Sequence, residues 1–258
     1  MATILKEIIG EVLVLKLNRP DKFNSFNKEM ALLMQSILEE AAADKAIRAI
    51  YITGEGKAFC AGQDLAEAID PNGPGIEIIV TGHYNPIIRF IRSIEKPVIC
   101  AVNGVAAGAG ANIALACDIV VGSENTSFIQ AFSKIGLIPD SGGTFFLPRI
   151  IGLQRATALM FTGEKVSAQD ALNFGMIYKI FPDDSLFNNG LEIARQLSKM
   201  PTLALGLTKK LLNQSFYTSY ENQLQEEAKA QVTAAKSEDY KEGVNSFLEK
   251  RKPILKGN

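Results

Sequence analysis

Two short runs rich in apolar and β-branched residues open the chain, at 3–8 and 12–17, with Gly10 and Glu11 between them. Runs of this kind joined by a tight turn predict a β-hairpin. After Asn27, a typical helix N-cap, apolar residues recur at helical spacing. These residues are Met30, Leu33, Met34, Ile37, Leu38 and Ala41. The pattern predicts an amphipathic helix directly after the hairpin.

A short apolar strand followed by a loop of small residues then occurs twice. The strand 49–53 precedes AFCAGQDL (58–65), and the strand 98–102 precedes NGVAAGAGAN (103–112), which leads into an apolar helix ending near Cys117. Strands alternating with helices predict right-handed β-α-β units, with the ligand site where the loops leave the carboxyl ends of the strands. Any chemistry is therefore expected in these loops.

Beyond Pro182 the pattern becomes helical only. From 184 to 248 the apolar period predicts helices without strands, interrupted at Pro201. The predicted fold class is therefore α/β, with a β/α core over 1–183 and a helical C-terminal region over 184–258.

Charge and cysteine content narrow the classes of partner. Lys and Arg number 27 against 28 Asp and Glu, a net charge of -1, so no overall field attracts nucleic acid or an anionic membrane. We expect neither partner. Cys60, Cys100 and Cys117 are odd in number and lack C-x-x-C spacing, which argues against a disulfide framework or a zinc site and favours a cytoplasmic location. No apolar run in the sequence reaches membrane-spanning length.

Each glycine-bearing loop has a plain structural interpretation beside a functional one. In the first loop, Ala61 and Gly62 would let a ligand approach the backbone, or the segment is a tight turn with Asp64 as a helix cap. The second loop leads into a helix whose free N–H groups suit a developing negative charge, although close helix-to-sheet packing also explains its small residues. The nucleotide-binding glycine motifs are incomplete or missing.

The two loops together resemble the crotonase (enoyl-CoA hydratase/isomerase) superfamily. The resemblance covers nearly the whole chain: NRPDKFNSF, AFCAGQDL, KPVICAVNGVAAGAGANIALACDIV, FSKIGLIPDSGGT and FLEKRKP. It implies a spiral of β-β-α units and a C-terminal helical region used for oligomerisation, usually into a trimer or a dimer of trimers. It also implies an acyl-CoA thioester substrate and no cofactor beyond the coenzyme A moiety of that substrate.

The resemblance assigns the thioester oxygen to the backbone N–H groups of Gln63 and Ala109. Removing a proton beside a thioester carbonyl creates an enolate, and one preorganised donor to its oxygen is worth roughly 3 kcal/mol. The residues placed against coenzyme A are Ala61, Asp64, Leu65, Phe247 and Lys250. The last two would act on a neighbouring subunit. Helical periodicity alone would instead interpret Phe247 and its neighbours Tyr240, Val244 and Leu248 as a packing stripe.

Asp140, in the segment PDSGGT, is by its local pattern the N-cap of a helix. The resemblance makes it the acid/base. Hydratases of the superfamily use two glutamates, but the matching positions are Asn112 and Phe132, and neither side chain can act as a base. Isomerisation needs only one carboxylate that takes a proton from one carbon and returns it to another.

The resemblance therefore predicts an acyl-CoA isomerase, with the branch that isomerises 1,2-epoxyphenylacetyl-CoA as the closest match. The reaction would be the rearrangement of that ring epoxide to an oxepin, in phenylacetate catabolism, or the shift of a 3-enoyl to a 2-enoyl double bond. An enoyl-CoA hydratase is the alternative enzyme. A non-catalytic acyl-CoA or RNA-binding homologue is the alternative from another class.

Four residues are predicted to line the acyl pocket: Tyr84, Asn85, Asn112 and Phe132. For Tyr84 and Asn85 the alternative is surface exposure. For Phe132 the alternative is ordinary core packing, although an aromatic ring there would also keep the pocket dry and raise the pKa of a nearby acid. His83, the only histidine, is interpreted as a solvated or packing residue rather than a catalytic one.

Overall fold

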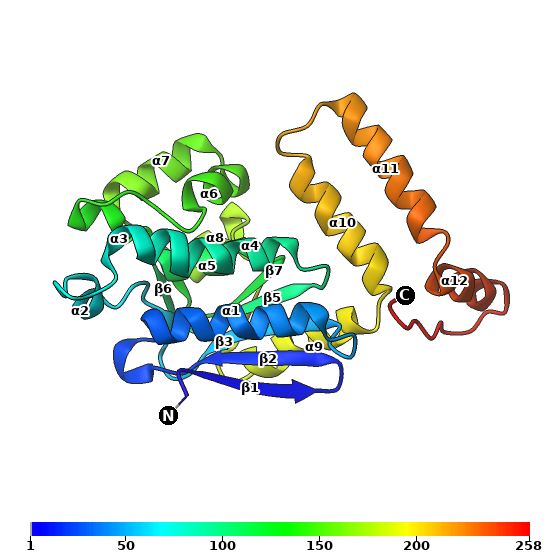
Figure 1. Ribbon diagram of the computed structural model, residues 1–258, viewed down its shortest axis with the longest axis horizontal. Helices are drawn as coiled ribbons and strands as arrows, with labels where there is room; N and C mark the ends of the chain where they lie inside the picture. The colour runs from blue at the N-terminus through cyan, green and yellow to red at the C-terminus, as the bar shows by residue number, and fades with distance from the viewer. Residues whose placement is uncertain (1) are drawn as a thin grey trace.

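The computed structural model describes residues 2–258, in which a six-stranded sheet forms the centre of the molecule (Figure 1). Its strands are β1 (Ile4–Ile9), β2 (Val12–Leu17), β3 (Ala49–Gly54), β5 (Val98–Val102), β7 (Ile119–Ser123) and β10 (Lys179–Phe181), in the order β1-β2-β3-β5-β7-β10. The predicted hairpin is confirmed, because β1 and β2 are antiparallel. All the other neighbours in this sheet are parallel.

A second, four-stranded sheet explains why the simple β-α-β prediction was incomplete. Its short strands are β4 (Ala58–Cys60), β6 (Val105–Ala107), β8 (Ser127–Ile129) and β9 (Lys165–Ser167), in the order β4-β6-β8-β9. β3, β5 and β7 are each followed by a short strand of this sheet before the next helix, so the repeat is β-β-α. Strands of three residues are too short to show a period of two in the sequence.

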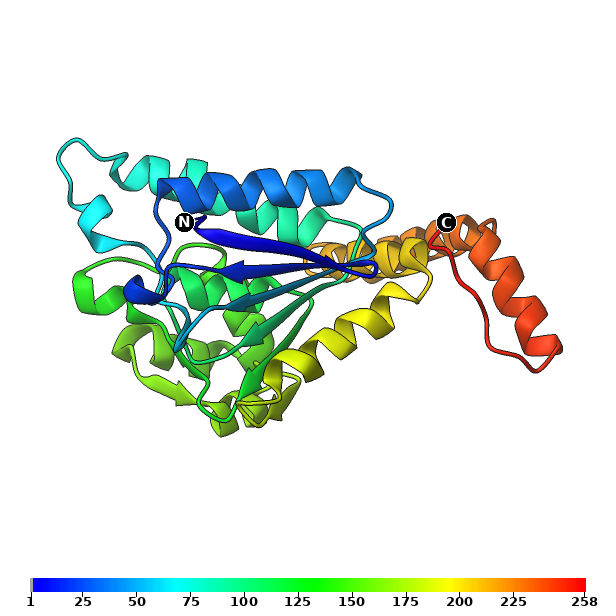
Figure 2. The same ribbon diagram turned by 90° about the horizontal axis from the view of Figure 1, so that it is seen from below.

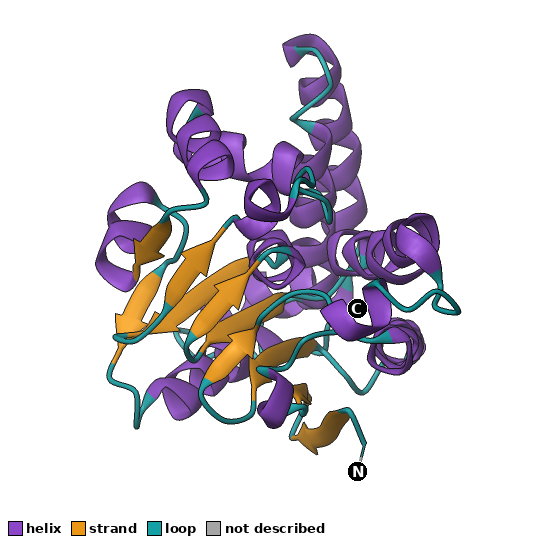
Figure 3. Cartoon of the chain, turned by 90° about the vertical axis from the view of Figure 1, so that its left-hand side faces the viewer, coloured by secondary structure: helices purple, strands orange, loops and turns teal. Residues whose placement is uncertain are grey.

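The central sheet is covered on both faces, which is why nearly every residue of its middle strands β3 and β5 is buried and most of these residues are apolar. Along β3, Ile50 and Ile52 pack towards α1 (Lys28–Ala43), α4 (Asn85–Ser93) and α5 (Ala109–Ala116). Ala49 and Tyr51 point to the opposite face, where they meet α9 (Leu186–Ser198). Figure 2 shows α1 and α9 on the two sides of the sheet, and Figure 3 shows the strands enclosed between helices.

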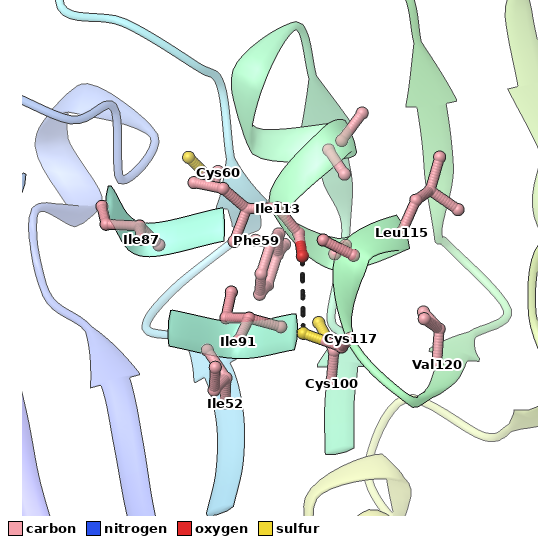
Figure 4. Packing of buried hydrophobic residues seen from close by; sticks show 14 of the residues in the cluster. Ile52, Phe59, Cys60, Ile87, Ile91, Cys100, Ile113, Leu115, Cys117 and Val120 are labelled. Atoms are coloured by element: carbon pink, nitrogen blue, oxygen red, sulfur yellow. Dashed lines mark hydrogen bonds between the residues drawn. The ribbon is translucent and has the colours of Figure 1, made fainter. Parts of the chain in front are cut away.

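The core between the two sheets and α4 and α5 holds all three cysteines. Figure 4 shows Cys60, Cys100 and Cys117 among isoleucines of β3, α4 and α5, with the Cys117 thiol donating to the carbonyl of Ile113 at 3.4 Å. All three are buried and unpaired, as expected for a chain without a disulfide framework. Burial raises the pKa of the Cys60 thiol to about 12, so it stays protonated and behaves as an apolar residue.

Asn27 caps α1 as predicted, because its side-chain oxygen accepts from the N–H of Met30 at 3.0 Å. The shorter helices surround the second sheet and the loops. They are η1 (Pro20–Lys22), α2 (Leu65–Ala68), α3 (Gly75–Ile78), η2 (Ile79–Tyr84), η3 (Ala131–Ile135), α6 (Gly143–Ile151), α7 (Leu153–Thr162) and α8 (Ala168–Phe174).

The C-terminal part is helical, as the apolar period predicts. After α9 come α10 (Thr202–Gln214), directly behind Pro201, then α11 (Tyr220–Ala234) and α12 (Glu238–Leu248). The ammonium of Lys209 on α10 donates to Asp118 at 2.7 Å and ties this helix to the core. Figures 1 and 2 show α11 and α12 standing away from the sheets, whereas α9 belongs to the packed core. In residues 2–258, no helix is long and apolar enough to cross a lipid bilayer.

Candidate active site

The first loop leaves β4 and presents the N–H of Gln63 to one side. Phe26 forms a parallel bridge with this loop: its N–H donates to Gly62 at 2.7 Å, and its carbonyl accepts from Asp64 at 2.8 Å. A parallel bridge uses the groups of the residues before and after the central one, so the N–H of Gln63 points away from Phe26. The sequence alone did not indicate this role of Phe26.

The second loop ends at the start of α5, where the first N–H groups of a helix have no partner within the helix. Gly108 precedes the helix with a φ of 53°, and its own N–H donates to Ile129 at 2.9 Å. Ala109 is the first helical residue and is buried. Within residues 2–258, neither the N–H of Gln63 nor that of Ala109 donates to a protein acceptor. Both N–H groups are therefore unpaired donors within the part of the chain that the structure describes.

Glycines bring these two loops into backbone contact. A Cβ on Gly62 would lie 3.5 Å from the nitrogen of Ala109, and one on Gly110 would lie only 2.3 Å from the carbonyl oxygen of Cys60. The close-packing interpretation is therefore confirmed. This contact also brings the segments that carry Gln63 and Ala109 against each other, and two neighbouring backbone donors are what an oxyanion hole requires.

Asp64 caps α2, as its local pattern predicts, by accepting from the N–H of Ala66 at 3.1 Å. The other carboxylate oxygen accepts from the guanidinium of Arg19 at 2.8 Å. Burial opposes ionisation of Asp64, but these hydrogen bonds outweigh it, so its pKa lies below the ordinary value. Asp64 therefore stabilises the loop as an anion. Ala61 and Leu65 are exposed to solvent. Contact of Ala61, Asp64 and Leu65 with coenzyme A stays a prediction.

Asp140 lies in the turn before α6, and its predicted role as a helix N-cap is wrong. The residue at the N-cap is Gly142, which has a φ of 75° and no side-chain capping bond. Ser141 also has a positive φ, 51°, and its hydroxyl donates to the Asp140 carboxylate at 2.8 Å. Two consecutive left-handed residues separate the Asp140 side chain from the helix end. Burial raises the pKa of this half-buried carboxyl, although hydrogen bonds from Ser141 and its own N–H oppose the shift.

Asn112 connects Asp140 to α5, the helix that begins at Ala109. The side chain of Asn112 is fully buried, and its NH₂ group donates to the backbone carbonyl of Asp140 at 2.9 Å. Its oxygen accepts from the Gln130 amide at 2.8 Å. Since Asn112 lies one helical turn beyond Ala109, the candidate base and the candidate oxyanion donor are held by the same short helix.

Tyr84 lies between the first loop, at Gln63, and Asp140. It is completely buried, so the alternative of surface exposure is wrong, and its hydroxyl donates to the side-chain oxygen of Gln63 at 3.0 Å. Burial, followed by the nearby Cys60 and Asp140, raises the pKa of the phenol well above its ordinary value. Tyr84 therefore stays neutral, close to Gln63 and Asp140. Its neighbour Asn85 is half-buried at the start of α4.

Phe132 is buried against the start of α5. Its ring lies 3.7 Å from the place that a Cβ on Gly108 would occupy. Core packing is thus confirmed for Phe132. His83 is buried as well, and burial lowers the pKa of its imidazole, which favours the packing interpretation over the solvated one.

The structure does not bring Phe247 and Lys250 to this site. Phe247 is on α12 and Lys250 follows it, at the end of the molecule remote from α2 (Figure 1). The Phe247 side chain is 83% exposed, and Tyr240 and Val244 of the same stripe are also exposed. Packing of this stripe within the chain is therefore wrong.

Besides Phe26, three residues that hold the site together were not predicted from the sequence: Arg19, Gln130 and Ser141. Arg19 is part of the quoted NRPDKFNSF segment, but its partner Asp64 is 45 residues away. The Gln130–Asn112 bond spans 18 residues, and no local pattern indicates it. The positive φ of Ser141 could have been suspected only from the Gly142–Gly143 pair that follows it.

Comparison with known proteins identifies the family of the chain. The family model described as enoyl-CoA hydratase/isomerase matches residues 7–258. The chain is 44% identical to a protein of Escherichia coli K12 named 1,2-epoxyphenylacetyl-CoA isomerase, covering 100% of this chain and 99% of that protein. It is 39% identical to a Rhodobacter capsulatus protein named probable enoyl-CoA hydratase, covering 99% and 98%.

A solved structure has the same fold. The enoyl-CoA hydratase of Bacillus anthracis superposes with a TM-score of 0.95 at 32% identity, over 99% of this chain and 100% of that one. The expected spiral of β-β-α units with a C-terminal helical region is thus confirmed. The chain belongs to the enoyl-CoA hydratase/isomerase family of the crotonase superfamily.

Proposed function

We propose that this protein is an acyl-CoA isomerase in which Asp140 transfers the proton while the N–H groups of Gln63 and Ala109 hold the thioester oxygen. The observation that carries the proposal is the hydrogen bond from Asn112 to the Asp140 backbone. It attaches a half-buried carboxyl to the same helix that presents the free N–H of Ala109. A base and an oxyanion hole within one small site are what enolate chemistry requires.

For a 3-enoyl thioester the reaction needs no other component. The Asp140 carboxylate takes a proton from C2, and the electron pair left behind moves onto the thioester oxygen, where the two N–H groups stabilise it. The resulting carboxylic acid returns the proton to C4, and the double bond ends between C2 and C3. A raised pKa assists this step, because the acid formed in the first half must hold its proton before returning it.

The side chains at the two positions that the resemblance assigns to hydratase glutamates support isomerisation over hydration. Phe132 carries no group that could activate water. Both polar atoms of the Asn112 amide are already used, one by Asp140 and one by Gln130. Hydration remains the second candidate because a relative at 39% identity carries the name of a hydratase.

The proposed substrate is ring-1,2-epoxyphenylacetyl-CoA, which would be isomerised to its oxepin in phenylacetate catabolism. The 44% identity to the Escherichia coli protein named for that substrate supports this choice over an unbranched 3-enoyl chain. Both reactions place the developing charge on the thioester oxygen, so both use the same N–H groups.

A panel of thioesters tests the function. We expect the purified chain to isomerise the ring epoxide with kcat/KM on the order of 10⁴ M⁻¹s⁻¹ or more, and a 3-enoyl-CoA less efficiently. Mass spectrometry of the products should show no gain of water from a 2-enoyl-CoA. Rapid addition of water would make the protein a hydratase, and tight binding of every thioester without turnover would make it a binding protein.

We further propose that Phe247 and Lys250 contact coenzyme A in the site of a neighbouring subunit of a homotrimer or a dimer of trimers. Phe247 is exposed on α12, which stands away from the core (Figure 2), and Lys250 just beyond this helix is exposed as well, which supports the proposal. Mixing tests it: subunit exchange between an Asp140→Asn variant and a Phe247→Ala/Lys250→Ala variant should restore sites with both parts intact. Activity above the sum of the separate variants is the expected result, and a monomer by sedimentation would refute the arrangement.

A further inference from the structure

We propose that Asn112 is a positioning residue: its buried amide, held by Gln130, fixes the backbone of Asp140 and thereby aims the carboxyl at the substrate. This inference rests on the proposed function, which makes Asp140 the base. It changes the role of Asn112 from a residue of the acyl pocket to one that acts through Asp140.

The orientation of the Asn112 amide is determined by its partners. The Asp140 carbonyl oxygen can only accept, so the NH₂ group of Asn112 must face it, at 2.9 Å. The oxygen of Asn112 then faces Gln130, which supplies an N–H at 2.8 Å. Asn112 and Gln130 are both buried, so water does not compete for the two hydrogen bonds that link Gln130 to Asn112 and Asn112 to Asp140; we call this pair of bonds the relay.

The turn that this relay supports is strained. Ser141 adopts a φ of 51°, a conformation that costs a non-glycine residue about 1 kcal/mol or more, and Gly142 follows at 75°. The Asp140 carbonyl accepts two hydrogen bonds that hold the turn, one from Asn112 and one from the N–H of Gly143 at 2.8 Å. Without the first of these, the peptide after Asp140 can rotate.

The side-chain amide of Asn112 is also closely packed. A Cβ on Gly143 would lie 2.4 Å from the side-chain nitrogen of Asn112, so the start of α6 rests directly on this amide. Asn112 therefore sets the separation between the Ala109 N–H on α5 and the Asp140 carboxyl before α6. A misplacement of about 1 Å between reacting groups can cost about a hundredfold in rate.

One consequence is that a glutamate at position 112 would not simply create a hydratase. An ionised carboxylate has no proton to donate to the Asp140 carbonyl, and it would add a buried negative charge beside a second carboxylate. The position that the resemblance assigns to a water-handling glutamate is used in this chain to support the isomerase base.

The test is Asn112→Asp, which keeps the shape of the side chain and removes the donor. We expect kcat for isomerisation to fall by about ten- to a hundredfold while KM changes less than about threefold, since the oxyanion donors stay in place. On an Asp140→Asn background the same substitution should cause no further loss, because Asn112 acts only through Asp140.

Asn24→Asp is the matched control. Asn24 is also fully buried, and its NH₂ group donates to the carbonyls of Glu55 and Ala58, both at 2.8 Å, away from Asp140. Asn24→Asp should lower the free energy of unfolding at least as much as Asn112→Asp does. It should nevertheless keep the kcat of the parent protein. Equal loss of kcat in both variants, or a further loss on the Asp140→Asn background, would overturn the positioning role. Full activity of Asp140→Asn itself would instead refute the proposed function.

Discussion

Replacing Asp140 by asparagine is expected to lower kcat for isomerisation by about 10²- to 10⁴-fold, the usual contribution of a general acid–base group. Asparagine has the same shape and can still accept from Ser141, so the turn should keep its geometry. It cannot accept the substrate proton. Binding of the thioester should change little, because the N–H groups of Gln63 and Ala109 are not altered.

The pH profile provides a second measurement on the same variant. Asp140 must be ionised to take the proton, so the parent should lose kcat as the pH falls through the pKa of this carboxyl. Burial raises that pKa, so the loss should begin above the range of an ordinary aspartate, about 3.9. Asp140→Asn should lack this acid limb. An Asp184→Asn variant, at an exposed position, should keep it. Parent-like kcat in Asp140→Asn would contradict the assignment.

The behaviour of Asp140 shows where prediction from the sequence stops. The segment PDSGGT resembles a capping sequence, yet the left-handed Ser141 and Gly142 move the helix start beyond the reach of the carboxyl. That conformation depends on Asn112, which lies 28 residues earlier. A local pattern contains no information about a contact of that range, so only the resemblance to a family could suggest the base.

Elements with a periodic pattern could be predicted because the residues that determine them lie close together in the sequence. The hairpin, α1 and the helical C-terminal region all follow from repeating apolar positions within one segment. The proposed oxyanion hole could be predicted only in part. Its small residues can be seen in the sequence, but the direction of the Gln63 N–H depends on the bridge to Phe26, 37 positions earlier in the chain. Glycines in a pattern therefore indicate a close approach without indicating which donors it leaves free.

Replacing Ala109 by proline is expected to lower kcat/KM by about 10²- to 10³-fold, as the loss of one oxyanion donor does. Proline removes the N–H and places its ring where that hydrogen pointed. The fold should survive, because Ala109 is the first residue of α5, a position where proline is well tolerated. Gly108 before it has φ 53° and ψ −127°, the mirror image of the extended conformation that normally precedes proline, which glycine adopts readily.

Leu153→Pro provides the control for the backbone change. Leu153 is the first residue of α7, it also follows a glycine with positive φ, and its side chain is 74% exposed. Both variants should show the parent's helical circular dichroism and cooperative unfolding, and only Ala109→Pro should lose activity. Because a backbone N–H acts regardless of the side chain, Ala109→Ser should stay within about threefold of the parent rate if the residue acts only through that N–H. A folded Ala109→Pro with parent kcat/KM would show that the thioester oxygen is held elsewhere.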